Sequence, residues 1–140
     1  MKALHFIVII LLLAGCSEDE EPIPQLSADF ADTFIVIGSS EQDGSVSIEL
    51  NRVPLFPTIV EVKVTNASGT VYGVDYMTNP QAVNDSIEMT FPFGSTESSL
   101  RISKLKLAED HEEKSFNLTI ISVSNNGLPG SNYALKVDLE

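Results

Sequence analysis

The sequence Val60-Glu61-Val62-Lys63-Val64 alternates apolar and charged side chains at every step. This period of two is typical of a β-strand whose apolar face is buried and whose polar face meets water. The same alternation recurs along most of the chain, and no stretch has the spacing of an amphipathic helix. The strands predicted in this way are 34–37, 45–50, 60–64, 87–91, 116–120 and 133–139.

A further strand is predicted over 100–107, where the apolar residues change phase. Leu105 lies out of phase with Leu100 and Ile102. Because a shift of one residue moves a side chain to the other face of a sheet, we predict a β-bulge near Ser103-Lys104. Five of the six connections between the seven short strands contain glycine or proline. Together they indicate an all-β fold, an antiparallel immunoglobulin-like β-sandwich.

The beginning of the chain has the layout of a secretory signal. Lys2 is followed by a short apolar run that ends in Leu13-Ala14-Gly15-Cys16. This ending resembles the lipobox of bacterial lipoproteins. The resemblance implies cleavage before Cys16 and acylation of this cysteine, the only one in the chain, which would anchor the protein in a lipid bilayer. The alternative is an ordinary signal peptide followed by an incidental cysteine.

An acidic segment, Ser17-Glu18-Asp19-Glu20-Glu21, follows directly and precedes Pro22-Ile23-Pro24. Adjacent carboxylates repel one another and proline favours extended chain, so this segment is predicted to be a solvated tether. It resembles the acidic export tag of surface-exposed lipoproteins of some Gram-negative bacteria, which implies an outer-membrane protein at the cell surface. A periplasm-facing lipoprotein with a plain spacer is the alternative. The predicted organisation is a signal peptide over 1–15, a lipidated tether over 16–26 and one sandwich over 27–140.

The charge of the chain excludes one class of partner. The formal net charge is −12 at pH 7, and loss of the single positive charge in residues 1–15 makes it −13. A surface of this sign repels DNA and RNA, so we expect no nucleic-acid partner. It attracts divalent cations instead.

Several segments resemble the Calx-beta domain, an immunoglobulin-like sandwich. Residues 69–76, Gly-Thr-Val-Tyr-Gly-Val-Asp-Tyr, are similar to the family's G-T-A-x-x-G-x-D-Y turn. Residues 41–46 resemble its E-x-x-G-x-V strand entry, and residues 91–94 resemble its F-x-x-G motif. Residues 109–116 resemble its acidic loop and the F-x-L strand that follows. The resemblance covers 38–140.

Many Calx-beta domains bind calcium at one end of the sandwich. The positions that the resemblance implies as Ca²⁺ ligands are Glu41, Asp75, Glu109, Asp110, Glu112 and Glu113. Six carboxylates suit a cation that takes about six to eight oxygen ligands. The acidic loop is shorter than in strong calcium binders, however, and the closing run of aspartates is missing. The alternative is therefore a set of solvated carboxylates, and Asp75 can be explained by hydrogen bonds to backbone amides of its own turn.

No residue pattern indicates an enzyme. After the signal, His111 is the only histidine, and it lies among acids. A Ser/His/Asp triad needs a base beside a nucleophile, and a zinc site needs several histidine or cysteine ligands. We expect a non-enzyme that requires no cofactor. Ser86, in Asp85-Ser86-Ile87, resembles a short bacterial O-glycosylation motif, although three residues also occur by chance.

Apolar and aromatic residues of the predicted turns offer a further candidate surface. Leu55 and Phe56 lie between two prolines, and we expect them to cap the core, with a partner contact as the alternative. Tyr72, Phe56 and Phe93 could form a sugar-stacking platform or pack on turns. The sequence thus predicts a surface-anchored binding or adhesion module with an unknown protein or glycan partner. The rival hypothesis is a small accessory subunit of an outer-membrane complex for glycan or nutrient uptake.

Overall fold

The computed structural model describes residues 21–67, 69–106 and 113–140. Over these ranges the chain forms no helix, and hence none long and apolar enough to span a membrane. The strands are β1 (Ser27–Phe30), β2 (Phe34–Ile37), β3 (Asp43–Leu50), β4 (Thr58–Ala67), β5 (Tyr76–Asn79), β6 (Ser86–Phe91), β7 (Glu97–Lys104), β8 (Lys114–Val123), β9 (Leu128–Pro129) and β10 (Ala134–Leu139).

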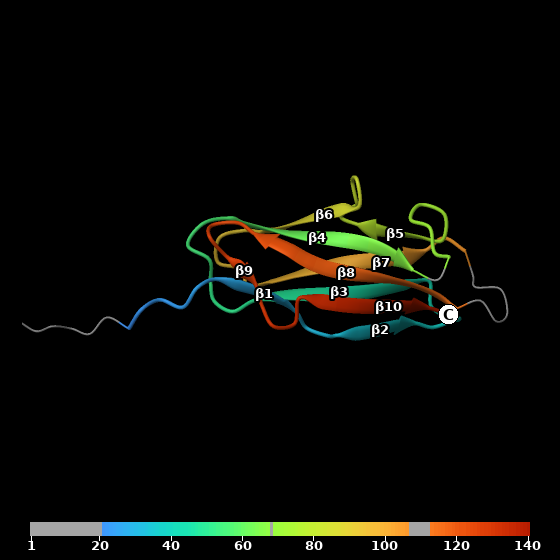
Figure 1. Cartoon of the computed structure of the whole chain (residues 1–140), viewed down its shortest axis with the longest axis horizontal. Helices are drawn as coiled ribbons and strands as arrows, with labels where there is room; N and C mark the ends of the chain where they lie inside the picture. The colour runs from blue at the N-terminus through green and yellow to red at the C-terminus, as the bar shows by residue number, and fades with distance from the viewer. Residues whose placement is uncertain (1–20, 68, 107–112) are drawn as a thin grey trace, which may run out of the picture.

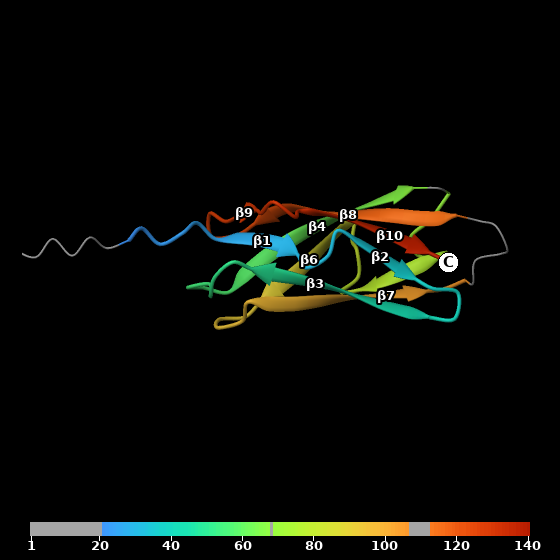
Figure 2. The same ribbon diagram turned by 90° about the horizontal axis from the view of Figure 1, so that it is seen from below.

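The strands form two five-stranded sheets that pack face to face (Figures 1 and 2). One sheet has the order β5-β7-β3-β1-β9 and the other has the order β2-β10-β8-β4-β6. All pairings are antiparallel except two: β9 pairs in parallel with β1, and β2 pairs in parallel with β10. Both β9 and β2 are edge strands. The predicted all-β, immunoglobulin-like sandwich is confirmed.

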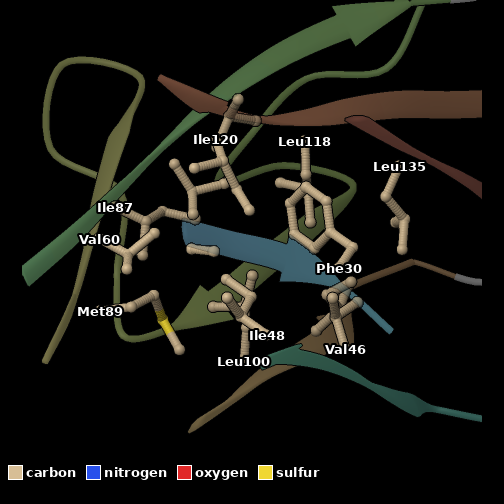
Figure 3. Packing of buried hydrophobic residues seen from close by; sticks show 14 of the residues in the cluster. Phe30, Val46, Ile48, Val60, Ile87, Met89, Leu100, Leu118, Ile120 and Leu135 are labelled. Carbon is tan, nitrogen blue, oxygen red and sulfur yellow. The ribbon is translucent and has the colours of Figure 1, made fainter. Parts of the chain in front are cut away.

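The core lies between the two sheets and is built from the apolar halves of the alternating strands (Figure 3). Val60, Leu118 and Leu135 of one sheet face Ile48 of the other, and all are fully or almost fully buried. Phe30 of β1 lies near the middle of this layer. Burial of each such side chain contributes about 1.5–3 kcal/mol, so the alternation itself determines which face of each strand turns inward.

The structure adds three short strands that the alternation does not reveal, β1, β5 and β9. It also corrects the predicted bulge at Ser103-Lys104. Strand β7 pairs with β3 in unbroken register from Glu97 to Ser103 and ends at Lys104. Lys104 is buried like Leu100 and Ile102, four and two positions before it, so the alternation of buried residues runs unbroken to the end of β7. Leu105 lies beyond the strand and is exposed. A register shift occurs instead in the pairing of β4 with β8, where Glu61 pairs with Ser122 and Val62 pairs with Ile120.

The two ends of the sandwich differ, and we name them by their position relative to the predicted tether. The tether pole consists of the connections 51–57, 92–96 and 124–130. Residues 21–25 run off this end, where the Pro24 carbonyl accepts a hydrogen bond from Arg52 Nε at 2.7 Å (Figure 1). Leu26, at the end of the predicted tether, is already buried.

The far pole is the opposite end. It consists of the connections 38–42 and 69–75, of Leu105, Lys106 and Glu113, and of the end of β10 at Glu140.

The positions of the loops at the two poles correct two expectations: the capping of the core by Leu55 and Phe56, and the shared aromatic platform. Leu55 and Phe56 are 62 % and 64 % exposed at the tether pole, so they do not cap the core. Phe93 lies at the same pole, whereas Tyr72 belongs to a far-pole connection. The three aromatic residues therefore do not form one sugar-stacking platform.

Candidate functional site

Asp75 is the central residue of the candidate site at the far pole, and its carboxylate is fully engaged. It closes the turn between β4 and β5, where Val71 N donates to Asp75 Oδ2 at 2.7 Å and Asp75 N donates to Val71 O at 2.9 Å. Gly69 and Gly73 adopt positive φ angles of 70° and 80°, which a glycine adopts without the clash that a Cβ atom would cause. The predicted explanation of Asp75 as an acceptor for its own turn is confirmed.

The second oxygen of this carboxylate is paired with a lysine. Lys114 Nζ donates to Asp75 Oδ1 at 2.8 Å, and the Asp75 side chain is only 5 % exposed. This hydrogen bond, together with that from the Val71 amide, holds the pKa of the Asp75 carboxyl below its ordinary value, although burial acts in the opposite direction. The Asp75 carboxylate is thus stabilised in its ionised form by a cation from the chain itself.

The tyrosines of the same segment build a rigid support beneath the turn. The Tyr76 ring is fully buried and stacks on Phe116 with centroids 3.9 Å apart, while its hydroxyl donates to Asn66 Oδ1 at 2.7 Å. Burial raises the pKa of the Tyr76 hydroxyl well above its ordinary value. The Tyr72 hydroxyl accepts from Ala82 N at 2.9 Å, which ties the turn to the connection after β5.

A second lysine, Lys104, lies at the same pole and is almost completely buried, with 3 % of its surface exposed. Its ammonium donates to Gly38 O at 2.6 Å and to Glu140 O at 2.7 Å, and it lies 3.4 Å from Ile37 O. These oxygens come from the end of β2 and the end of β10. Since an ammonium has three N–H donors, main-chain oxygens can satisfy all of them. Lys104 therefore joins both sheets at the far pole.

Of the other predicted ligands, only Glu41 and Glu113 belong to the described residues, and both are exposed. Glu41 Oε2 accepts from Gly38 N at 3.1 Å within the connection between β2 and β3. The neighbour of Glu41, Gln42, accepts from Lys104 N, and Asp75 O accepts from Leu105 N. These two bonds bring Glu41 and Asp75 to the same end of β7.

The remaining three predicted ligands, Glu109, Asp110 and Glu112, lie outside the described residues, as do His111 and Cys16.

The described donor set does not fit a calcium ion. Both oxygens of Asp75 already accept hydrogen bonds, and Asp43, at the start of β3, is paired with Arg101 at 2.6 Å. Within 21–67, 69–106 and 113–140, no group of three or more His, Cys, Asp or Glu residues is placed to hold a metal ion. The buried ammonium of Lys104 adds a positive charge where a bound Ca²⁺ would need negative ligands. Among the residues that the structure describes, this pole provides charge pairs and exposed loops rather than a cage of free oxygens.

Ser86, the predicted glycosylation position, begins β6 and is half-buried. Its hydroxyl donates to Glu61 Oε1 at 2.6 Å, and Ser122 Oγ donates to Glu61 Oε2 at 3.1 Å. The hydroxyl is thus part of a cross-strand network on the outer face of its sheet.

Sequence analysis missed the two lysines that organise the far pole. Lys114 immediately precedes Ser115-Phe116, and the acidic residues before it suggested metal ligands rather than an ion pair. Lys104 could have been found, because it occupies the buried position after Leu100 and Ile102 in a strict alternation. We predicted a bulge instead, because Leu105 lies out of phase with Leu100 and Ile102.

Comparison with known proteins supports the fold and nothing finer. No family model matches the chain, and no curated protein matches it in sequence. An apo-form Calx CBD1 domain matches in structure with a TM-score of 0.67 and 15 % identity, over 83 % of this chain and 96 % of that one. The chain has a Calx-beta-like fold. The Calx CBD2 domain matches with a TM-score of 0.63 and 15 % identity, over 80 % of this chain and 84 % of that one.

Other sandwiches show the same architecture at a greater distance. The periplasmic chaperone SfaE matches with a TM-score of 0.54 and 16 % identity, over 81 % of this chain and 57 % of that one. A two-domain protein of unknown function from Bacteroides fragilis matches with a TM-score of 0.54 and 7 % identity, over 83 % of this chain and 45 % of that one. At such identities the likeness concerns the fold alone, so the function of this Calx-beta-like chain has to be argued from its own residues.

Proposed function

We propose that this protein is a lipid-anchored, non-enzymatic binding module that presents the far pole of its sandwich to a protein or glycan partner at the outer surface of a bacterial outer membrane. The observation that carries the proposal is the opposition of the two poles. Residues 21–25 leave the domain at the tether pole, and the exposed connections 38–42 and 69–75 lie at the other end (Figures 1 and 2). An anchor at Cys16 would therefore attach the domain to the membrane at its tether pole and leave the far pole free to face away from it.

The rigidity of the far pole supports a role in recognition. The buried turn of Asp75 and the buried ammonium of Lys104 fix the bases of its loops. Beside them, three apolar residues are each 45–49 % exposed: Val71, Val74 and Leu105. A rigid loop base reduces the conformational entropy that is lost on binding, which favours affinity. Apolar side chains beside charged ones are also the usual composition of a protein–protein contact.

We further propose that this pole works without calcium, because Lys114 and Lys104 already supply positive charge to it. A metal bound by the folded state alone, at 100 times its dissociation constant, would raise the free energy of unfolding by about 2.7 kcal/mol. We expect the melting temperature of the chain from Cys16 onward to be the same in millimolar calcium and in chelator at matched ionic strength. A rise of several degrees that magnesium does not reproduce would contradict the calcium-free proposal and favour calcium-dependent adhesion.

The anchor is tested on the full chain expressed with its leader in a Gram-negative host. We expect mass spectrometry of the membrane-extracted protein to show an acylated N-terminal Cys16 and protease added to intact cells to degrade it. The Cys16→Ala variant is the control and should leave the membrane fraction. Unmodified protein in the soluble fraction would refute the anchor, and protection from protease would favour the periplasm-facing alternative.

The binding surface is tested by cross-linking from both ends of the molecule. A photo-reactive residue at Val74 marks the far pole, and one at Phe93, which is 70 % exposed, marks the tether pole. We expect cross-linked partners in cells from Val74 and none shared with Phe93. A partner that is itself an outer-membrane transporter would support the accessory-subunit hypothesis, and identical products from both positions would refute recognition by the far pole.

A further inference from the structure

The tether pole carries an apolar surface that the proposed function leaves unexplained. Its exposed side chains stand at the tips of two adjacent connections: Val53 is 51 % exposed, Leu55 62 %, Phe56 64 % and Phe93 70 %. The two connections follow β3 and β6, which belong to different sheets, so the tips project from both layers of the sandwich at one end (Figure 2). A cluster of large apolar side chains exposed at one end marks an interaction site.

The same pole is free of acidic residues, although the chain is strongly acidic as a whole. None of the 20 Asp and Glu residues of the chain lies in 51–57, 92–96 or 124–130, and Arg52 is the single charged residue of these segments. The nearest carboxylate on β7, Glu97, accepts a hydrogen bond from Ser47 Oγ at 3.2 Å, which turns it back along β3. The end of the sandwich thus presents apolar side chains, amides and one guanidinium.

The path of the chain determines what this surface meets. Arg52 Nε and Asn51 Nδ2 hold the carbonyls of Pro24 and Gln25 at 2.7 Å and 2.8 Å, so the tether leaves from the apolar pole itself. Pro24 lies eight positions after Cys16. Fully extended, these eight steps along the chain span at most about 29 Å, since each spans about 3.6 Å. An acylated Cys16 therefore keeps the tips of the tether pole close to the lipid surface.

We propose that the tether pole is a membrane-contacting face, in which Leu55, Phe56 and Phe93 enter the head-group region of the leaflet that holds the acyl groups of Cys16. This inference rests on the proposed lipid anchor. Apolar side chains gain free energy in the acyl boundary, and a single arginine and backbone amides are compatible with head groups. The acidic residues of the tether disfavour anionic lipids, so the occupant is a neutral, zwitterionic surface. Contact at this face would hold the far pole outward.

The chain offers a direct test because it contains no tryptophan and a single cysteine. A Phe56→Trp variant of the chain from Cys16 to Glu140 is coupled through Cys16 to a maleimide lipid in phosphatidylcholine vesicles. We expect the tryptophan emission to move to shorter wavelength and to lose intensity when the vesicles contain lipids with brominated acyl chains. A Val71→Trp variant at the far pole is the matched control, since Val71 is 49 % exposed, and it should keep its intensity.

Equal intensities of Phe56→Trp in brominated and ordinary vesicles would overturn the proposal. A blue shift without quenching would also overturn it, because it would assign the tether pole to contact between copies of the protein. Circular dichroism of both variants confirms that they are folded. Chemical coupling supplies the anchor in this experiment, so its outcome is separate from acylation in cells, which the mass spectrum of the membrane-extracted protein tests.

Discussion

Replacement of Lys104 by methionine removes a buried charge that joins the ends of β2, β7 and β10. The variant keeps the length and the apolar stem of the side chain and deletes only the ammonium. Two short hydrogen bonds are lost, to Gly38 O at 2.6 Å and to Glu140 O at 2.7 Å, together with the longer approach to Ile37 O. We expect the far pole to loosen and the domain to become less stable.

The magnitude follows from these contacts. Hydrogen bonds to a charged group contribute about 1.5–3 kcal/mol each. Part of this gain is offset in the wild type by the cost of removing the ammonium from water, and Glu140 is exposed enough for water to replace its partner. The net loss in the free energy of unfolding is therefore about 2–4 kcal/mol, which lowers the melting temperature of a domain of this size by about 10 °C.

The assay is thermal and urea-induced unfolding of the chain from Cys16 onward, followed by circular dichroism at pH 7. The matched control is Lys106→Met, which removes an exposed lysine from the same segment and should change stability by less than about 0.5 kcal/mol. If Lys104→Met melts within the same margin of the wild type, the buried ammonium does not hold the two sheets together. The calcium-free proposal would then rest on Lys114 alone.

Two further substitutions probe the turn beside this lysine. Asp75→Asn should destabilise the domain by about 1–3 kcal/mol at pH 7, because it removes the charge that Lys114 pairs with. Since the folded-state pKa of Asp75 is lowered, the stability from this pair is present above the unfolded value of about 3.9 and is lost as the pH falls through the lower, folded value. Denaturation curves should therefore show the variant and the wild type converging below about pH 4, and a constant gap would contradict the ion pair. Tyr76→Phe should cost about 1 kcal/mol through the lost bond to the exposed Asn66, without a change in the acidic part of the pH profile, where Asp75 titrates.

The fold could be predicted from the sequence wherever a strand is long enough to show its period. Strands β4 and β8 contain ten residues each, so the alternation of apolar with polar residues is unambiguous. Strand β9 contains two residues and β5 four, and β5 follows a turn motif that hides it. These strands form because backbone groups at the sheet edges find partners, and such pairing leaves no pattern in the side chains.

For the candidate site, the sequence predicts local turns but not the contacts between residues far apart in the chain. The turn of Asp75 could be predicted, because glycine and aspartate have local conformational roles that act within a few residues. The partner of its carboxylate could not, since Lys114 lies 39 positions later in the chain and only the pairing of β4 with β8 brings it near. A cluster of acidic residues in a sequence therefore indicates charge, whereas the fold decides whether a metal or a lysine neutralises it.

The two poles of the molecule differ in charge and in exposed apolar surface. Cations from the chain neutralise buried and exposed acids at the far pole, whereas the tether pole has no acids to neutralise and exposes aromatic residues instead. Such a division has no benefit for the stability of the sandwich, because Phe56 and Phe93 contribute little to the core when they are 64 % and 70 % exposed. It does suit a domain with one end toward lipid and the other toward water. A short tether alone does not provide this orientation, because it restricts the distance of the domain from the membrane but not its direction.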